Sequence, residues 1–141
     1  MLRGTDDISE QIYVLSILQQ KFVHDQLKQI GLNEMQARTI HYVNSFPGHI
    51  QKDLAAYLGK QDATVTNLLK QMEKMNYLRR EIPNNNERQK HLFLTDYGVE
   101  KANQIQFVFI ELEKKMNSDF IQVDIQSLKS LLKKLSNSMT K

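Results

Sequence analysis

Apolar residues recur at intervals of three and four positions along most of this chain, and this periodicity restricts it to a helix-rich fold. A helix with one buried side needs an apolar residue about once per turn, whereas a half-buried strand alternates at every second residue. The pattern predicts helices over residues 7–30, 33–46, 50–58, 62–75, 96–117 and 121–139. With 40% apolar residues and only 5 Gly and 2 Pro among 141 residues, the composition disfavours a disordered chain, collagen-like repeats and a loop-rich all-β fold.

Residues that suit helix ends stand at the predicted boundaries. Gly31 is placed to end the first helix, and Asn33 with Gln36 three residues later has the form of a capping box for the second. Gly59 separates the third helix from the fourth. Asn76 suits the left-handed position that follows the fourth helix.

The middle of the chain has the order of elements of a winged helix. Two helices joined by a few residues around Gly59 fit a helix-turn-helix. The β-compatible runs 77–82 and 91–95 then flank a polar, turn-forming segment with basic residues. We therefore predict a mainly α fold of the α+β winged helix kind, with long N- and C-terminal helices. It would form one domain, with a winged helix-turn-helix lobe at 33–95 and terminal helical segments at 1–32 and 96–141.

The excess of positive charge in the chain lies in this lobe. The net charge is +3, with 19 basic and 16 acidic residues. Eight of the basic and five of the acidic residues lie between Gln51 and Thr95, so the remaining segments together are neutral. A localised basic surface favours a phosphate-bearing partner.

The terminal helices carry apolar stripes that need a cover. The stripe of the first helix begins at Ile8, and that of the last extends to Met139. A symmetric second copy of the chain is the economical cover, so we expect a homodimer.

Several classes of function lack their sequence signals. There is no cysteine, which excludes disulfides, cysteine-ligated metals and thiol-based sensing. No glycine-rich phosphate loop, nucleophile elbow or His-Glu-x-x-His motif occurs, so we expect neither an enzyme nor a cofactor. No two histidines stand three or four residues apart; His24 and His41 could meet a carboxylate only through the fold, and we expect no metal site. Without an apolar membrane span or leader segment, we expect a cytoplasmic protein.

This order of elements resembles the MarR family of transcriptional regulators over nearly the whole chain. The family wing typically carries Asp-x-Arg-x-Lys, followed four residues later by Leu-Thr-x-x-Gly. Here the wing reads Asn86-Glu87-Arg88-Gln89-Lys90, and then Leu94-Thr95-Asp96-Tyr97-Gly98. Asn86 replaces the usual aspartate, and the segment 62–78 also resembles the family, with Asn76 in place of a usual glycine.

The resemblance implies a homodimer with intertwined terminal helices and two winged helices on a palindromic operator. The fourth helix would enter the major groove, where Asn67 can make a bidentate pair with adenine. The wing would reach the minor groove, where arginine is favoured. The residues that we predict to contact double-stranded DNA are Gln61, Thr64, Thr66, Asn67 and Lys70 of the fourth helix, Lys52 and Lys60 before it, and Arg80, Arg88 and Lys90 of the wing.

The resemblance also implies a cleft for a small aromatic or anionic effector between the dimerisation helices and the DNA-binding lobe. The candidate lining residues are Tyr13, Arg38, His41, Tyr42 and Phe107. The alternative is that these side chains belong to the core or to a subunit interface.

Two functions are thus open to this sequence. The first is a dimeric, sequence-specific DNA-binding regulator, most often a repressor in such families. The second is a winged-helix interaction module that has lost operator recognition, which Asn86 in the wing favours. The localised charge and the polar face of the fourth helix favour the first.

Overall fold

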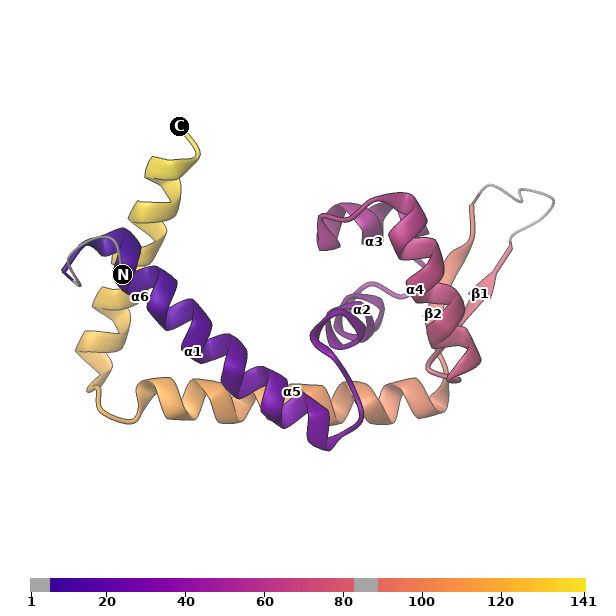
Figure 1. Ribbon diagram of the computed structural model, residues 1–141, viewed down its shortest axis with the longest axis horizontal. Helices are drawn as coiled ribbons and strands as arrows, with labels where there is room; N and C mark the ends of the chain where they lie inside the picture. Colours follow the sequence, from indigo (N-terminus) through magenta and orange to yellow (C-terminus); the bar gives the residue numbers. More distant parts are fainter. Residues whose placement is uncertain (1–5, 83–88) are drawn as a thin grey trace. The chain divides into compact units, whose positions relative to one another are not determined.

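The computed structural model describes residues 6–82 and 89–141 of the chain. Figure 1 shows long helices and one short hairpin, which confirms the predicted mainly α winged-helix fold. The elements in chain order are α1 (Ile8–Gln29), α2 (Glu34–Ser45), α3 (Gln51–Leu58), α4 (Asp62–Lys74), β1 (Leu78–Glu81), β2 (His91–Leu94), α5 (Asp96–Asn117) and α6 (Gln122–Met139). Each lies within a few residues of its predicted span.

The chain divides into two compact units, residues 1–109 and 110–141. The first unit holds α1 to α4, the hairpin and the beginning of α5, and the second holds the end of α5 with α6. The predicted wing residues Asn86 and Arg88 lie outside the described residues.

The helix ends follow the predicted local chemistry. The Asn33 side chain accepts a hydrogen bond from the Gln36 backbone N–H at 2.8 Å, and the Gln36 side chain accepts one from the Asn33 N–H at 3.0 Å. The backbone is left-handed at Gly31, Gly59 and Asn76, with φ of 78°, 65° and 66°. These three positions turn the chain sharply because glycine and asparagine tolerate that conformation.

The hairpin is a two-stranded antiparallel sheet. Leu78 pairs with Leu94, and Glu81 pairs with His91. The other edge of β2 receives the loop after α2, where the Gly48 N–H donates to the Leu92 carbonyl at 2.8 Å. The His91 Nδ1 also donates to the Gly48 carbonyl at 2.6 Å. These hydrogen bonds attach the hairpin to the loop that connects α2 with α3.

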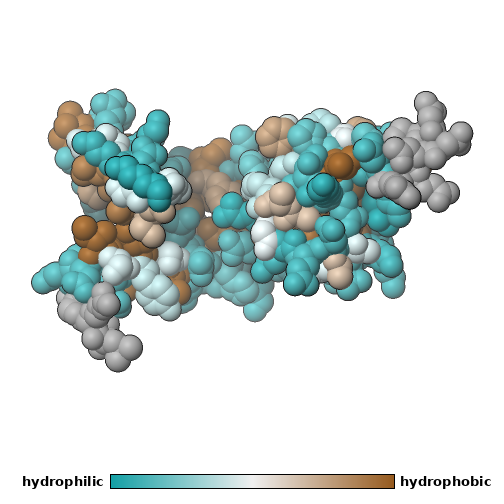
Figure 2. All heavy atoms as spheres, turned by 90° about the horizontal axis from the view of Figure 1, so that it is seen from above, coloured by the Kyte–Doolittle hydropathy of each residue, from teal (hydrophilic) through white to brown (hydrophobic). Residues whose placement is uncertain are grey.

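A single apolar core holds the first unit together. Fully buried side chains come from α1, α2, α3, α4, β2 and α5; among them are Leu27, Ile40, Leu54, Leu69, Leu92 and Ile105. Hydrophilic side chains cover most of the visible face of the lobe, while apolar ones gather near the beginning of α1 (Figure 2).

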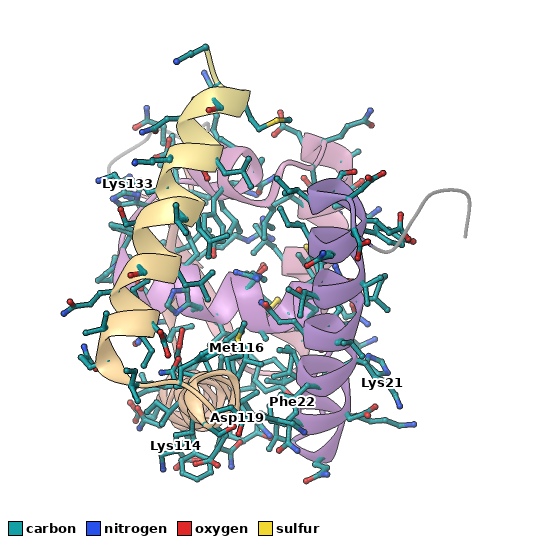
Figure 3. All side chains as sticks on the ribbon, turned by 90° about the vertical axis from the view of Figure 1, so that its left-hand side faces the viewer. Lys21, Phe22, Lys114, Met116, Asp119 and Lys133 are labelled. Carbon is teal, nitrogen blue, oxygen red and sulfur yellow. The ribbon has the colours of Figure 1, made fainter. Side chains whose placement is uncertain are left out.

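The terminal helices keep much of their apolar surface exposed. In α1 only Val23 and Leu27 are buried, and Ile8 to Leu18 form an exposed apolar stripe. None of the residues of α6 is buried. Charged side chains such as Lys21 of α1 and Lys133 of α6 point away from their helices (Figure 3).

The end of α4, the hairpin and the start of α5 meet at one backbone position. The Tyr77 carbonyl accepts a hydrogen bond from the Thr95 N–H at 3.1 Å, and the Thr95 hydroxyl donates to the Asn76 carbonyl at 2.6 Å. The Gly98 N–H donates to that hydroxyl at 3.0 Å, which caps α5. Gly98 packs so closely that a Cβ atom would lie 1.9 Å from the Tyr77 carbonyl oxygen.

We therefore expect Gly98→Ala to destabilise the protein by about 3 kcal/mol, because the added methyl group must push apart two backbone segments. Urea unfolding followed by circular dichroism measures this change. Val99→Ala, at an exposed neighbour in the same turn, is the control and should change the free energy of unfolding by less than about 1 kcal/mol. An unchanged urea midpoint for Gly98→Ala would contradict the close approach of the two segments.

Candidate nucleic-acid interface

The buried stripe of α4 decides which of its side chains face outward. Val65, Leu69 and Met72 have no exposed surface. They fill the core, which leaves the opposite side of the helix in solvent. The exposed residues of that side include three predicted DNA contacts, Thr64, Asn67 and Lys70, while Gln61, also exposed, is the N-cap residue just before the helix.

The predicted DNA-binding residue Thr66 is partly covered and has a partner from α3. The Gln51 side-chain amide donates to the Thr66 hydroxyl oxygen at 2.7 Å. This bond joins the first turn of α3 to the second turn of α4 and helps to hold the two helices of the helix-turn-helix. The Thr66 hydroxyl proton stays available for an acceptor.

A groove of about 470 Å³ lies beside Thr66, between the two helices and the hairpin. The start of α3 contributes Lys52, β1 contributes Arg80, and the segment before β2 contributes Lys90. Asp62 is an acidic residue on its wall. Three cations beside the N-terminus of α3 make a setting that favours an anion, because the free N–H groups of a helix start add positive potential.

Arg80 is already paired within the protein. Its Nε lies 2.5 Å from Oε1 of Glu73 in the last turn of α4, and the two side chains are 15% and 31% exposed. This ion pair connects α4 directly to the hairpin. Because Glu73 offsets much of its charge, Arg80 is a weaker candidate for phosphate binding than Lys52 or Lys90.

The structure describes all but one of the remaining predicted DNA-binding residues. Lys52 and Lys60 are exposed, and Lys90 is partly covered. Arg88 lies outside the described residues. Three further residues belong to this region. Gln51 and Gln89 line the groove, and Glu73 pairs with Arg80 on its wall. A sequence signal for Glu73 is lacking, because only the fold brings it beside Arg80.

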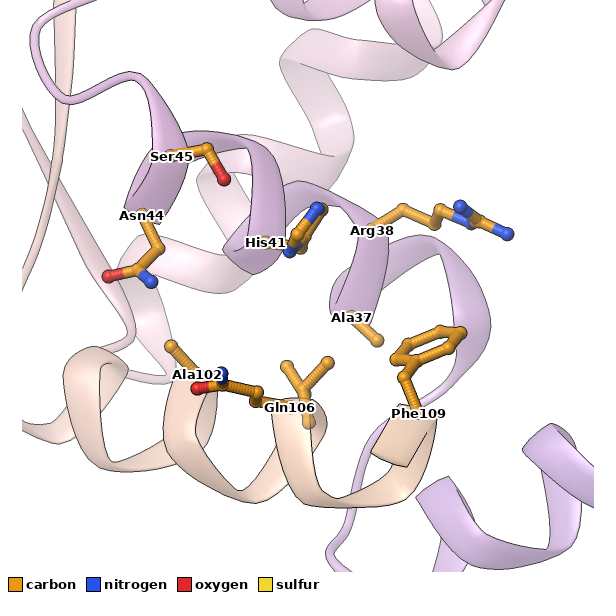
Figure 4. Close-up of a pocket in the computed structure, with 9 residues that line it drawn as sticks. Ala37, Arg38, His41, Asn44, Ser45, Ala102, Gln106 and Phe109 are labelled. Carbon is orange, nitrogen blue, oxygen red and sulfur yellow. The ribbon is translucent and has the colours of Figure 1, made fainter. Parts of the chain in front are cut away.

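A second cavity of about 350 Å³ lies between α2 and α5 (Figure 4). Arg38 and His41 approach it from α2, and the Arg38 guanidinium lies 5.9 Å from the ring centre of Phe109 on α5. The remaining lining residues are Ala37, Asn44, Ser45, Ala102, Ile105 and Gln106. The cavity thus combines an apolar floor with several hydrogen-bonding groups and one full positive charge, partly offset by Glu34 at 3.8 Å.

Of the five predicted effector residues, the structure brings Arg38 and His41 together at this cavity. Tyr13 and Phe107 are 61% and 62% exposed and lie outside its lining. Tyr42 is buried elsewhere: its hydroxyl lies 3.0 Å from His49 Nδ1. Burial, and secondarily the negative charge of Asp53, raises the pKa of Tyr42.

The part of the chain that the structure describes contains no group of three His, Asp or Glu side chains placed to hold a metal ion. Within the same residues, no helix has the length and apolar character needed to cross a membrane.

Comparisons with known proteins agree with this geometry. A sequence model of the MarR family matches residues 30–89, which contain the helix-turn-helix and β1, the first strand of the hairpin. YwoH, an uncharacterized HTH-type transcriptional regulator of Bacillus subtilis strain 168, is 24% identical over 113 residues, covering 80% of this chain and 82% of that protein.

Solved structures share the fold. A structure from Clostridium acetobutylicum assigned to the MarR family is 29% identical, with a TM-score of 0.70, and the match covers 96% of this chain and 99% of that one. The Staphylococcus aureus MepR–DNA complex is 24% identical with a TM-score of 0.81, over 94% of this chain and 98% of that one.

Proposed function

Because this chain belongs to the MarR family of winged-helix transcriptional regulators, we propose that it acts as a homodimeric repressor on a palindromic operator. The observation that carries the proposal is the exposed polar face of α4 beside a groove with three cations. A polar helix face that fits the major groove reads bases, and neighbouring cations hold the phosphates. Such a regulator acts beside the chromosome, so we place it in the cytoplasm.

The roles within the interface follow from exposure. Asn67, at the centre of the exposed face, is the residue suited to read adenine, with Gln61 and Thr64 beside it. Lys52 and Lys90 bind phosphate and set the position of the lobe. MepR, which shares this fold, was solved as a complex with DNA, and this supports DNA binding by the lobe.

Homodimer formation is supported by the apolar surface that the single chain leaves open. The first part of α1 exposes side chains such as Ile8 and Leu15, at 67% and 59%. In the second unit, α6 exposes Leu131 at 60% and Met139 at 81%. Continuous apolar stripes of this kind are uncommon on monomers and typical of interfaces. In the proposed dimer, two copies of α4 read two symmetric half-sites.

Selection of bound sequences from a random pool of duplex DNA tests the function directly. We expect the purified protein to enrich a palindrome whose half-sites are about one helical turn apart. Its affinity should fall steeply as salt rises, and it should prefer the palindrome to random DNA by about a thousandfold or more. Weak binding without sequence preference, together with a protein complex that persists at high salt, would instead identify an interaction module.

Two substitutions separate base reading from phosphate binding on the selected operator. Asn67→Ala should weaken operator binding about tenfold or more and relax the preference at one base pair of each half-site. Lys90→Ala should weaken binding to all DNA alike and lower the salt slope by about one for each phosphate that the side chain neutralises. Lys133→Ala, on the exposed side of α6, is the control for removal of a positive charge. An equal decrease of specificity in both interface variants would contradict these roles.

The cavity between α2 and α5 supports a second element of the proposal, control by a small aromatic or anionic effector. Arg38 is placed to pair with a carboxylate while Phe109 and Ile105 contact a ring. Binding there would stabilise one arrangement of α2 against α5 and so alter the lobe that carries α4.

Thermal unfolding in the presence of benzoates, phenols and related carboxylates tests this cavity. A ligand at about 100 times its Kd should stabilise the wild type by about 2.7 kcal/mol, seen as a higher Tm. Arg38→Leu should abolish the shift for carboxylates, whereas Arg79→Leu, at an exposed arginine outside the cavity, should keep it. Equal shifts in both variants would place the ligand elsewhere.

A further inference from the structure

Lys101 connects two segments that lie far apart in the sequence. It stands in the second turn of α5 and is partly buried. Its Nζ donates to the carbonyl of Ile30, the C-cap residue of α1, at 2.6 Å. Figure 1 shows the end of α1 lying beside α5. A cation at this place is favoured because the last carbonyls of a helix lack partners within the helix and carry negative potential.

The same ammonium group also faces the aromatic pair at the end of α4. Its Nζ lies 5.6 Å from the ring centre of Tyr97. The Tyr97 ring stacks on Tyr77 with ring centres 5.3 Å apart. Tyr77 is 4% exposed, and its N–H donates to the Met72 carbonyl of α4 at 3.0 Å. Lys101 therefore lies between the end of α1 and the packed layer in which α4 ends.

The covalent link between α1 and the lobe is short, and the Gly31 and Leu32 N–H groups in it donate to the Lys28 and Leu27 carbonyls at 3.1 and 3.0 Å. Only four residues, 30–33, separate α1 from α2, and Gly31 among them has a left-handed backbone with nothing within 4 Å of where its Cβ would lie. Of α1, only Val23 and Leu27 are buried. The angle of α1 on the lobe thus depends on this short link, on a small apolar anchor and on the hydrogen bond from Lys101.

We propose that Lys101 is a positioning residue that fixes α1 on the DNA-reading lobe and thereby selects the spacing between the two half-sites of the operator. This inference rests on the proposed function, in which the exposed stripe of α1 takes part in the dimer. If α1 is held by the partner copy, its angle on each lobe sets the separation and rotation of the two α4 helices. Lys101 does not need to touch DNA to act in this way.

The test compares operators that differ only in spacing. One base pair inserted or deleted between the selected half-sites rotates one of them by roughly 34° and shifts it by about 3.4 Å. Fluorescence anisotropy then gives the affinity of each protein for the three spacings over a range of salt. Analytical ultracentrifugation and urea unfolding show that each variant is a folded dimer.

We expect the affinity of the wild type to fall about thirtyfold when the spacing changes by one base pair. Lys101→Met should bind the selected spacing about tenfold more weakly than the wild type does. Its affinities for the three spacings should differ by less than about fivefold. Its salt slope should equal that of the wild type, because the same phosphates stay neutralised. Lys101→Arg, which keeps a cationic donor, should retain most of the discrimination.

Matched variants separate positioning from charge and from folding. Lys28→Met removes the same charge from an exposed side chain in the last turn of α1 and should keep the wild-type spacing profile. Lys101→Gln keeps a donor on a side chain too short to reach Ile30, and it should show the broadened profile even if the Met variant unfolds.

The outcomes distinguish the two proposals. If the wild type selects a palindrome, and Lys101→Met and Lys101→Gln are both as selective in spacing as the wild type, the role of Lys101 alone is overturned. A lower salt slope in these variants would also overturn it, since Lys101 would then bind a phosphate. A wild type without dimer formation or palindrome preference overturns the proposed function, and the role of Lys101 with it.

Discussion

The interaction on which the rest of the first unit depends is the meeting of three elements at the Tyr77 carbonyl. That oxygen receives the Thr95 N–H, while Gly98 packs against it so closely that no side chain fits there. The end of α4, the root of the hairpin and the start of α5 are therefore held by backbone atoms, which cannot adjust as side chains can. A rigid junction of this kind gives the exposed face of α4 a defined orientation relative to the hairpin.

From this junction the structure extends in two directions. Toward the DNA, the Glu73–Arg80 ion pair and the Gln51–Thr66 hydrogen bond connect α4 to the hairpin and to α3. Toward the proposed dimer, the Tyr77–Tyr97 stack and Lys101 lead to the end of α1. The same few residues thus connect the exposed face of α4 to α1, the helix that would contact the second copy. In the proposed dimer, these residues would couple the orientation of α4 to the arrangement of the two copies without a long chain of intermediates.

The charge distribution acquires a more specific meaning in the structure. The excess of basic residues between Gln51 and Thr95 is not spread evenly over the lobe, because Arg80 is paired with Glu73 and Arg79 with Glu81. Lys52 and Lys90 have no such acidic partner among the ion pairs of the described residues, and both line one groove. Internal pairing therefore concentrates the usable charge beside α4.

Local chemistry in the sequence determined most of the architecture. Periodicity located every helix, and the residues at Gly31, Asn33, Gly59 and Asn76 marked their ends, because capping and left-handed turns depend on neighbours within a few positions. The polar face of α4 followed from the same periodicity. Only the tertiary structure decided that Arg80 meets Glu73, that Tyr42 faces His49 and not the cavity, and that Lys101 reaches Ile30. These interactions join residues through packing, and sequence spacing carries no record of which distant side chains the core brings together.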